Sequence, residues 1–210
     1  MDFQEFALKN FLPETAASDV VTCATKLLAS AREARILVVH ITVNFRHGYP
    51  EISPRNKMFC WLRDSGLIEP GSDGTAINAA LSPTEREPVI AKHRIGAFMG
   101  TDLDRILRAQ GIQTLICAGV TTSGVVLSTV RQAFDLDYEL IVVRDGCADT
   151  DNEVHDFLVD RIISHHAVIK CTDEVEQILN KSIGPDLARP SVVSRLRPAA
   201  DPAAAVRARP

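Results

Sequence analysis

The stretch Cys117-Ala-Gly-Val-Thr-Thr-Ser-Gly-Val-Val-Leu-Ser-Thr129 joins an apolar run to a turn that contains glycine. This order is typical of a strand that passes through a tight turn into a helix. Backbone N–H groups in such a turn point into the space above a sheet, where they can bind an anion or a developing oxyanion. Many α/β proteins have the same order, so the stretch indicates a site without defining its reaction.

Three further candidates follow a second apolar run, Pro88-Val-Ile-Ala91. Lys92 ends this predicted strand, and a buried Lys needs a functional reason. The alternative is a surface Lys whose aliphatic stem packs on apolar neighbours. Arg94 and Phe98 come just beyond it and could line a pocket, although Phe98 suits a core position equally well.

The loop Phe45-Arg-His-Gly-Tyr-Pro50 combines aromatic, cationic and turn residues directly after another predicted strand. Loops that follow strands often carry binding residues. Phe45, Arg46 and Tyr49 are therefore candidates for contact with a substrate. For Arg46 and Tyr49 a plain surface role is equally open.

The elements that must position these residues alternate along the chain. Helical spacing of apolar residues predicts a helix over 16–32, and a β-branched run predicts a strand buried on both faces over 35–43. Further strands are expected at 88–91, 114–118, 138–143 and 167–170, and helices at 102–110, 122–135, 152–164 and 173–179. Such alternation predicts an α/β fold, a three-layer α/β/α Rossmann-like sandwich with a mostly parallel sheet. Ligands of these folds bind beyond the carboxyl ends of the strands, where the candidates lie.

Size and composition fit one globular domain. The chain has 210 residues, of which 46% are hydrophobic and 24% charged, as in ordinary soluble proteins. No apolar run approaches the ~18 residues of a membrane span and no signal peptide is visible, so we expect a cytoplasmic protein without a membrane partner. A net charge of −4 argues against nucleic-acid binding, which needs a dense basic surface. A small-molecule substrate is the expected partner.

Two segments stand apart from the alternating pattern. Residues 45–80 would form an unusually long loop unless they pack as a lid or contribute to a subunit interface. The Pro-, Ala- and Arg-rich end from Gly184 to Pro210 is expected to be a disordered tail. We therefore divide the chain into a domain at 1–181 and a tail at 182–210. The five cysteines are widely spaced without a CxxC pair, so neither a disulfide framework nor a zinc knuckle is indicated.

Four motifs, in order, resemble the isochorismatase-like (cysteine hydrolase) superfamily across about residues 1–181. Gly119-Val-Thr-Thr-Ser-Gly-Val-Val126 is similar to the superfamily's Gly-Val-x-Thr-x-x-Cys-Val, and Lys92-His-Arg-Ile-Gly-Ala-Phe98 is similar to its Lys-x-Arg-x-x-Ala-Phe. Asp145-Gly-Cys-Ala-Asp149 resembles the acidic segment after the next strand. Met1-Asp-Phe-Gln4 resembles the end of the first strand, an apolar run that closes in Asp-x-Gln. The same fold is implied.

The resemblance implies catalytic roles for Asp2 and Lys92, and it puts Val125 where most members have the nucleophilic Cys. It also implies that the turn residues contact the substrate: Val120, Thr121, Thr122 and Gly124. A non-proline cis peptide is the superfamily's feature at the first two of these. Val cannot form a thiolate, so covalent thioester catalysis at this position is excluded. Cys147 is the one displaced thiol worth testing, and its alternative is a packing role.

Loss of the Cys leaves two functions open. Isochorismatases proper also lack it, and the resemblance implies for them hydrolysis of a vinyl ether by proton transfer from the Asp, with the Lys stabilising charge. The first hypothesis is therefore a hydrolase of a small polar metabolite that uses Asp and Lys. The alternative is a catalytically inactive relative that binds a small molecule or serves in assembly. Homo-oligomers are common among relatives.

Asp2 lies at the very start of the chain, without the apolar run that precedes it in relatives. A frayed terminus positions a catalytic group poorly. Either the natural start lies upstream, or catalysis has been lost. Some nicotinamidase-like relatives bind a metal through an Asp-x-His pair after the second strand, but His47 has no Asp or His at matching spacing. We expect neither a metal nor another cofactor.

Overall fold

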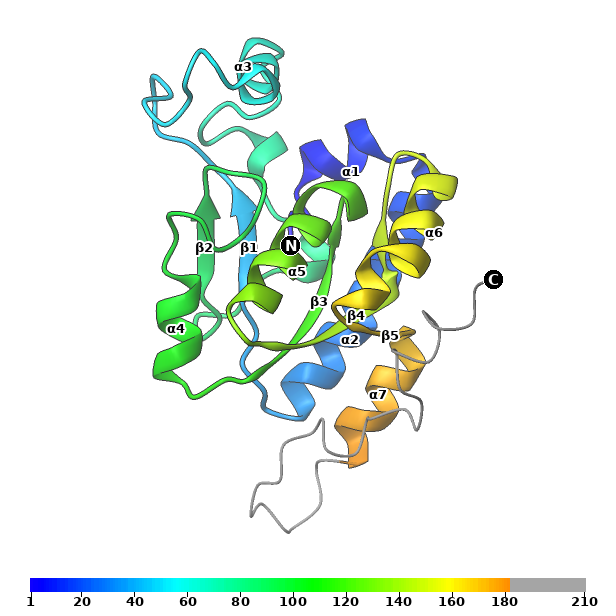
Figure 1. Cartoon of the computed structure of the whole chain (residues 1–210). Coiled ribbons are helices and arrows are strands. Elements are labelled where there is room, and N and C mark those ends of the chain that lie inside the picture. The colour runs from blue at the N-terminus through cyan, green and yellow to red at the C-terminus, as the bar shows by residue number, and fades with distance from the viewer. Residues whose placement is uncertain (182–210) are drawn as a thin grey trace, which may run out of the picture.

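The computed structural model describes residues 1–181, so the expected tail at 182–210 lies outside the described residues. Two groups of parallel strands form the centre (Figure 1). The first pairs β1 (His40–Val43) with β2 (Val89–Lys92), and the second has the order β3 (Thr114–Val120), β4 (Glu139–Ala148), β5 (Val168–Lys170). The α-helices are α1 (Glu5–Phe11), α2 (Glu14–Glu33), α3 (Lys57–Asp64), α4 (Leu103–Ala109), α5 (Leu127–Asp135), α6 (Asn152–Arg161) and α7 (Thr172–Lys181). A π-helix spans Thr122–Val126, and 3-10 turns span Asp73–Thr75, Ala79–Leu81 and Ile163–His165.

Strand β4 lies between two helical layers. Its side chains alternate between opposite faces, so successive residues contact different layers. Leu140 and Val142 pack in an apolar cluster with residues of α4, α5 and α6. Ile141 and Val143 pack on the other face with residues of α2 and α7. The α/β sandwich expected from the sequence is confirmed (Figure 1).

The first two residues join the two strand groups. The Met1 ammonium donates a hydrogen bond to the Ala118 carbonyl at 2.8 Å, and the Val120 N–H donates to the Met1 carbonyl at 3.1 Å. On the other side the Asp2 N–H donates to the Ile41 carbonyl at 2.9 Å. The expectation of a frayed Asp2 is therefore wrong, because its own main chain bonds to β1 and that of the preceding Met1 bonds to β3.

Gln4 extends this junction with its side chain. Its amide nitrogen donates to the Val43 carbonyl at 3.0 Å and to the Thr75 carbonyl at 2.7 Å. Its amide oxygen accepts from the Val43 N–H at 2.7 Å. The side chain is fully buried, so these three bonds satisfy the polar groups that burial removes from water.

The strand expected over 35–43 forms only at His40–Val43. Pairing with β2 begins opposite Val89, and no strand lies on the other side of 36–39 in the described part of the chain. Isolated extended backbone without a partner is not a strand, since strands are defined by their ladder bonds.

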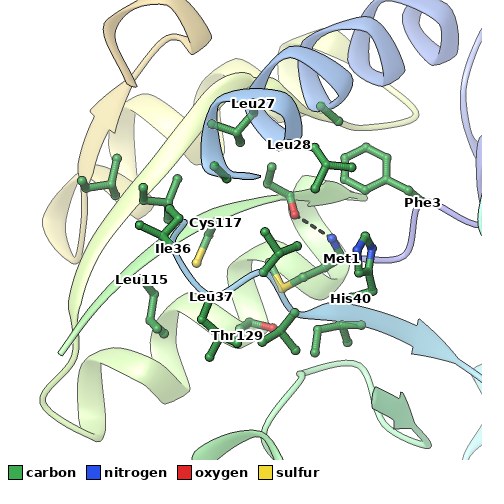
Figure 2. Close-up of a pocket in the computed structure, with 18 of the residues that line it drawn as sticks. Met1, Phe3, Leu27, Leu28, Ile36, Leu37, His40, Leu115, Cys117 and Thr129 are labelled. Carbon is green, nitrogen blue, oxygen red and sulfur yellow. Dashed lines mark hydrogen bonds between the residues drawn. The ribbon is translucent and has the colours of Figure 1, made fainter. Parts of the chain in front are cut away.

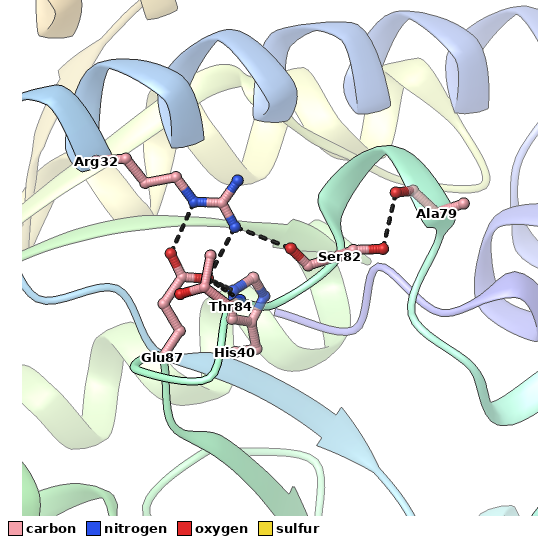
Figure 3. A network of polar contacts seen from close by, with 6 residues as sticks. All are labelled: Arg32, His40, Ala79, Ser82, Thr84 and Glu87. Atoms are coloured by element: carbon pink, nitrogen blue, oxygen red, sulfur yellow. Dashed lines mark hydrogen bonds and ion pairs between the residues drawn. The ribbon is translucent and has the colours of Figure 1, made fainter.

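A polar network fixes the start of β1 to the end of α2 (Figure 3). The Glu87 carboxylate accepts bonds from Arg32 at 2.7 and 2.8 Å, lies 2.9 Å from His40 Nε2, and accepts from the Thr84 N–H at 3.0 Å. The bidentate Arg32 guanidinium, above all, lowers the pKa of Glu87 to about 2. The carboxylate is therefore ionised across the neutral range.

Residues 45–80 fold around α3 and two of the 3-10 turns. Phe45, Phe59 and Ile68 form their own apolar cluster with Phe6 and Val43, which seats the segment over the end of β1. On α3 the Trp61 side chain stays 55% exposed. Whether this surface meets another subunit stays a prediction.

None of the helices within residues 1–181 has the length and hydropathy to cross a bilayer.

Candidate active site

Asp2 and Lys92 meet at the centre of the fold, as the sequence comparison with the superfamily implied. Lys92 ends β2, and its ammonium donates to Asp2 Oδ2 at 2.8 Å. The same ammonium also donates to the Arg94 carbonyl at 3.2 Å. Asp2 is 6% exposed and Lys92 only 1%, so the surface alternative for Lys92 is excluded.

The two oxygens of the Asp2 carboxyl group differ in their contacts. Oδ1 is buried and has no hydrogen-bond partner among the described residues. Burial raises the pKa of Asp2, and the nearby Lys92 ammonium opposes that rise. A carboxyl with a raised pKa and an unpaired oxygen can hold a proton and hand it to a bound molecule.

Val125 lies in the π-helix that follows β3 and is 2% exposed. It belongs to the apolar cluster against which Met1 packs, on the same side of the sheet as α5. An aliphatic side chain here keeps this part of the cluster apolar.

The turn before this helix differs from the expected anion cradle. The Val120–Thr121 peptide is cis, as in the superfamily. However, the Ser123 N–H donates to Asp149 Oδ2 at 2.5 Å, and the Gly124 N–H donates to Thr121 Oγ1 at 3.2 Å. These two N–H groups are therefore not free for a ligand, because side chains cap the start of the helix.

Gly124 is required by this cap. A Cβ built on it would lie 2.7 Å from Thr121 Oγ1, which is closer than van der Waals contact permits. Thr122 is fully buried and its hydroxyl lies 2.7 Å from His155 Nδ1. The side chains of Thr121 and Thr122 therefore hold the turn together, and Val120 packs against Leu8 in a cluster near α1 and α2.

Asp149 and His155 are residues of the site that sequence reasoning did not single out. Asp149 is 3% exposed and caps the turn, whereas Asp145 at the other end of the acidic segment caps α7 through Thr172. Burial lowers the pKa of His155. The acidic segment was visible in the sequence, but nothing there separated one Asp from the other or pointed to His155.

The arginines predicted to face a substrate converge on Glu51. Arg46 pairs with the Glu51 carboxylate, and Arg94 Nη1 donates to the Glu51 carbonyl at 3.2 Å. Both side chains are exposed. Tyr49, half-buried with a φ of 52°, packs beside the Phe45 ring at 6.1 Å.

Two of the predicted aromatic contacts are core residues in the structure. Phe45 is buried among Phe59 and its neighbours. Phe98 is buried with its ring 5.9 Å from that of Tyr138, which corresponds to the core alternative that the sequence left open.

The two thiols nearest to this region are poorly suited to nucleophilic chemistry. Cys147 is buried on β4 opposite Gly119, and burial raises the pKa of its thiol to about 12. Burial likewise raises the pKa of Cys117 to about 11. Thiolate is the reactive species, so the packing alternative for Cys147 is favoured. No group of three or more metal-ligating side chains occurs within residues 1–181.

Comparison with known proteins agrees with this fold. The model of the isochorismatase domain family matches residues 1–174. The chain is 29% identical over 185 residues to the isochorismatase family protein YwoC of Bacillus subtilis, covering 85% of this chain and 96% of that protein. It is 30% identical over 159 residues to maleamate amidohydrolase of Pseudomonas putida, covering 74% and 72% of the two chains. A solved isochorismatase family protein from Desulfovibrio vulgaris superposes with a TM-score of 0.74 at 28% identity, over 85% of this chain and 95% of that one.

The chain therefore belongs to the isochorismatase family, a class of α/β hydrolases.

Proposed function

We propose that this protein hydrolyses a small polar metabolite by acid–base chemistry of Asp2 and Lys92, without a covalent thioester. The observation that carries the proposal is the buried ion pair of 2.8 Å, in which Asp2 Oδ1 has no partner. Burial of a carboxyl oxygen without a hydrogen-bond partner lowers the stability of the folded protein. Transfer of a proton to a bound substrate would explain why the protein keeps this oxygen unpaired.

The substrate class that fits this chemistry best is a vinyl ether. A relative in Pseudomonas putida is an amidohydrolase, but amide cleavage through a thioester needs a thiolate that Val125 cannot supply. A vinyl ether needs only a proton on its terminal alkene carbon, because the ether oxygen then stabilises the cation that forms.

The proposed reaction begins from the fraction of the protein in which Asp2 is protonated. Asp2 Oδ1 gives its proton to the alkene carbon, and water adds to the carbon that bears the ether oxygen and returns a proton to Asp2. The resulting hemiketal collapses to a ketone and an alcohol, so no group stays on the enzyme. Lys92 holds the carboxylate after proton transfer and stabilises its charge.

Turnover of isochorismate and of small amides tests this proposal. We expect vinyl ether hydrolysis that falls by about 10²–10⁴ in kcat/KM in Asp2→Asn, because Asn cannot deliver a carboxyl proton. Lys92→Met is expected to lower kcat as well. Unchanged turnover in Asp2→Asn contradicts the mechanism.

The alternative, a catalytically inactive relative that binds a small molecule or serves in assembly, is favoured by one observation. Asp2, Lys92 and Val125 are each at most 6% exposed. The ion pair of Asp2 and Lys92 could therefore have a purely structural role in the core. Val125→Cys distinguishes the two functions, because it supplies the missing thiol with little change of volume. An intact site gains amide hydrolysis that iodoacetamide and Asp2→Asn abolish.

Val126→Cys is the matched control, since the neighbouring residue lies in the same π-helix and is fully buried in the same cluster. It is expected to gain nothing. Two outcomes favour the inactive relative. The first is equal amide hydrolysis by the two Cys variants. The second is no amide hydrolysis by either variant together with no vinyl ether turnover by the parent protein.

A further inference from the structure

Three buried side-chain oxygens within residues 1–181 have no hydrogen-bond partner: Asp2 Oδ1, Glu51 Oε2 and Gln132 Oε1. The first belongs to the proposed catalytic pair. Gln132 Oε1 lies against Gly96, where an added Cβ would come within 2.3 Å of it, so packed main chain covers this oxygen. Neither Glu51 nor Gln132 lines the cavity of about 340 Å³ between the two strand groups, whose lining is mainly apolar (Figure 2). Glu51 is therefore a buried acceptor that the proposed reaction does not explain.

The loop that carries Glu51 follows β1 and is closed by two tight turns. The Tyr49 N–H donates to the Arg46 carbonyl at 3.0 Å, and the Ile52 N–H donates to the Tyr49 carbonyl at 3.0 Å. Tyr49 has a φ of 52°, a left-handed conformation that is uncommon for a bulky residue. Backbone strain of this kind is typical of functional loops, because only a well-determined surrounding structure keeps it. The turns bring the Arg46 guanidinium onto the Glu51 carboxylate.

His93 faces the same carboxylate from the end of β2. Its Nδ1 lies 2.6 Å from the Asn44 carbonyl oxygen, and a carbonyl oxygen can only accept, so Nδ1 carries the hydrogen. In the neutral ring Nε2 is then an acceptor. Nε2 lies 4.0 Å from Glu51 Oε1, which is too far for a hydrogen bond between the two atoms. Two acceptors therefore face each other, and the His93 side chain, 26% exposed, can be reached from solvent.

One donor atom can serve both acceptors. An atom about 2.9 Å from each of them fits their separation of 4.0 Å if it carries two hydrogens. A hydroxyl group has one hydrogen and would leave one acceptor unpaired, whereas an –NH2 group has two. Burial opposes the charge of Glu51, but hydrogen bonds, among them that of Arg46, lower its pKa. The carboxylate is therefore ionised and acts only as an acceptor.

Two guanidinium groups stand beside these acceptors. Arg46 uses Nη1 for the Glu51 carboxylate, and Arg94 uses Nη1 for the carbonyls of Glu51 and His93. Each guanidinium has further N–H groups on Nε and Nη2, which can donate to an oxygen of a ligand. Two cationic side chains and one carboxylate also disfavour a cationic ligand. A neutral group with an –NH2 and an oxygen fits these surroundings.

We propose that Glu51 and His93 form a binding site for a neutral carboxamide group, which we call the amide subsite. The –NH2 donates to the Glu51 carboxylate and to His93 Nε2, and the amide oxygen accepts from Arg46 or Arg94. The amide is recognised rather than cleaved. The Arg94 carbonyl accepts from the Lys92 ammonium at 3.2 Å, so the subsite adjoins the proposed catalytic pair. That the amide belongs to the substrate rests on the proposed function, whereas its binding does not.

The test measures binding without turnover. Succinamate, succinate and N,N-dimethylsuccinamate are titrated onto the protein while NMR follows the imidazole nitrogens of His93. Before any addition, we expect hydrogen on Nδ1 and none on Nε2. Succinamate is expected to shift the Nε2 resonance and to bind at least about 10-fold more tightly than the dimethyl compound, which lacks N–H hydrogens.

Three results overturn the amide subsite. The first is a hydrogen on Nε2 of the free protein. The second is equal affinity for succinamate and its dimethyl derivative. The third is succinate that binds as tightly as succinamate, which indicates an anion site on the arginines alone.

Variants assign the effect to the two acceptors. Glu51→Leu and His93→Phe are each expected to weaken succinamate binding by about 10-fold or more. His47→Phe is the matched control, because His47 is an exposed residue of the same loop, and it should leave the affinity unchanged. Unchanged affinity in both acceptor variants overturns the proposal. If these variants do not fold, the comparison of the three compounds on the parent protein decides.

Failure of this proposal is separate from failure of the proposed function. Succinamate binding without vinyl ether turnover contradicts only the reaction, and turnover without succinamate binding contradicts only the subsite.

Discussion

Replacement of Lys92 by Met leaves the Asp2 carboxyl group buried without a cation. Oδ1 has no partner already, and Oδ2 loses its bond of 2.8 Å. Asp2 then takes up a proton in the folded protein. Against an ordinary pKa near 3.8, this proton uptake costs about 4 kcal/mol at neutral pH, since each pH unit corresponds to about 1.4 kcal/mol. The free energy of unfolding is expected to fall by up to that amount.

The pH dependence of this loss has a definite sign. A carboxyl group whose folded pKa is raised contributes stability below its unfolded pKa and loses that contribution as the pH rises through the folded value. Lys92→Met raises the folded pKa of Asp2 further. Its penalty should therefore shrink to less than about 2 kcal/mol at pH 5, as measured by urea denaturation at both pH values.

The double variant Asp2→Asn with Lys92→Met should recover most of the lost stability, to within about 1 kcal/mol of the parent, because neutral groups replace the whole pair. Lys9→Met is the matched control, since Lys9 pairs with Glu5 on an exposed helix face and should change stability by less than about 0.5 kcal/mol. Additive effects of the two site substitutions, or a Lys92→Met penalty equal at pH 5 and 7, would refute the reasoning.

Three further predictions concern the surroundings of the site. Glu87→Gln should lower the free energy of unfolding by about 2–3 kcal/mol at pH 7. Because the pKa of Glu87 is lowered to about 2 from 4.5, this difference should persist above pH 4.5 and vanish as the pH falls toward 2, and a constant difference in denaturation curves would contradict it. Iodoacetamide at pH 8 should leave Cys117 and Cys147 unmodified in the folded protein and label both in urea, as read by mass spectrometry; rapid labelling of folded Cys147 would reopen it as a nucleophile. Asp149→Ala should cost about 1–3 kcal/mol and speed exchange of the Ser123 amide, whereas an unchanged exchange rate would show that the cap is dispensable.

The order of most elements was predictable because most strands and helices carry their own periodicity. The expected helix over 16–32 is α2, and the expected strand over 138–143 is the first part of β4. Helices α1 and α3 were not predicted. Each is short, at 7 and 8 residues, and short helices form through packing on neighbours rather than through local propensity.

Part of the candidate site could be expected from the sequence, and part of its geometry could not. The superfamily motifs pointed to Asp2 and Lys92, and the structure brings both together. No local pattern could show that Asp149 takes the Ser123 N–H, because that bond joins residues from two different strand ends. The strand expected over 35–43 was overestimated for a similar reason, since β-branched residues indicate a strand only where a neighbour supplies the other half of the ladder.

The hydrogen bonds of the buried Gln4 amide restrict which side chains the amino-terminal junction can accept at position 4. One functional group must offer an oxygen to the Val43 N–H and hydrogens to two carbonyls, those of Val43 and Thr75. Glu has no hydrogen to offer when ionised, and Asn is one methylene too short to reach from the same backbone. Hydrolysis of the Gln4 amide during ageing would place a carboxylate against the carbonyl oxygens of Val43 and Thr75 and remove both donated hydrogen bonds. The attachment of residues 45–80 to the end of β1 would therefore weaken.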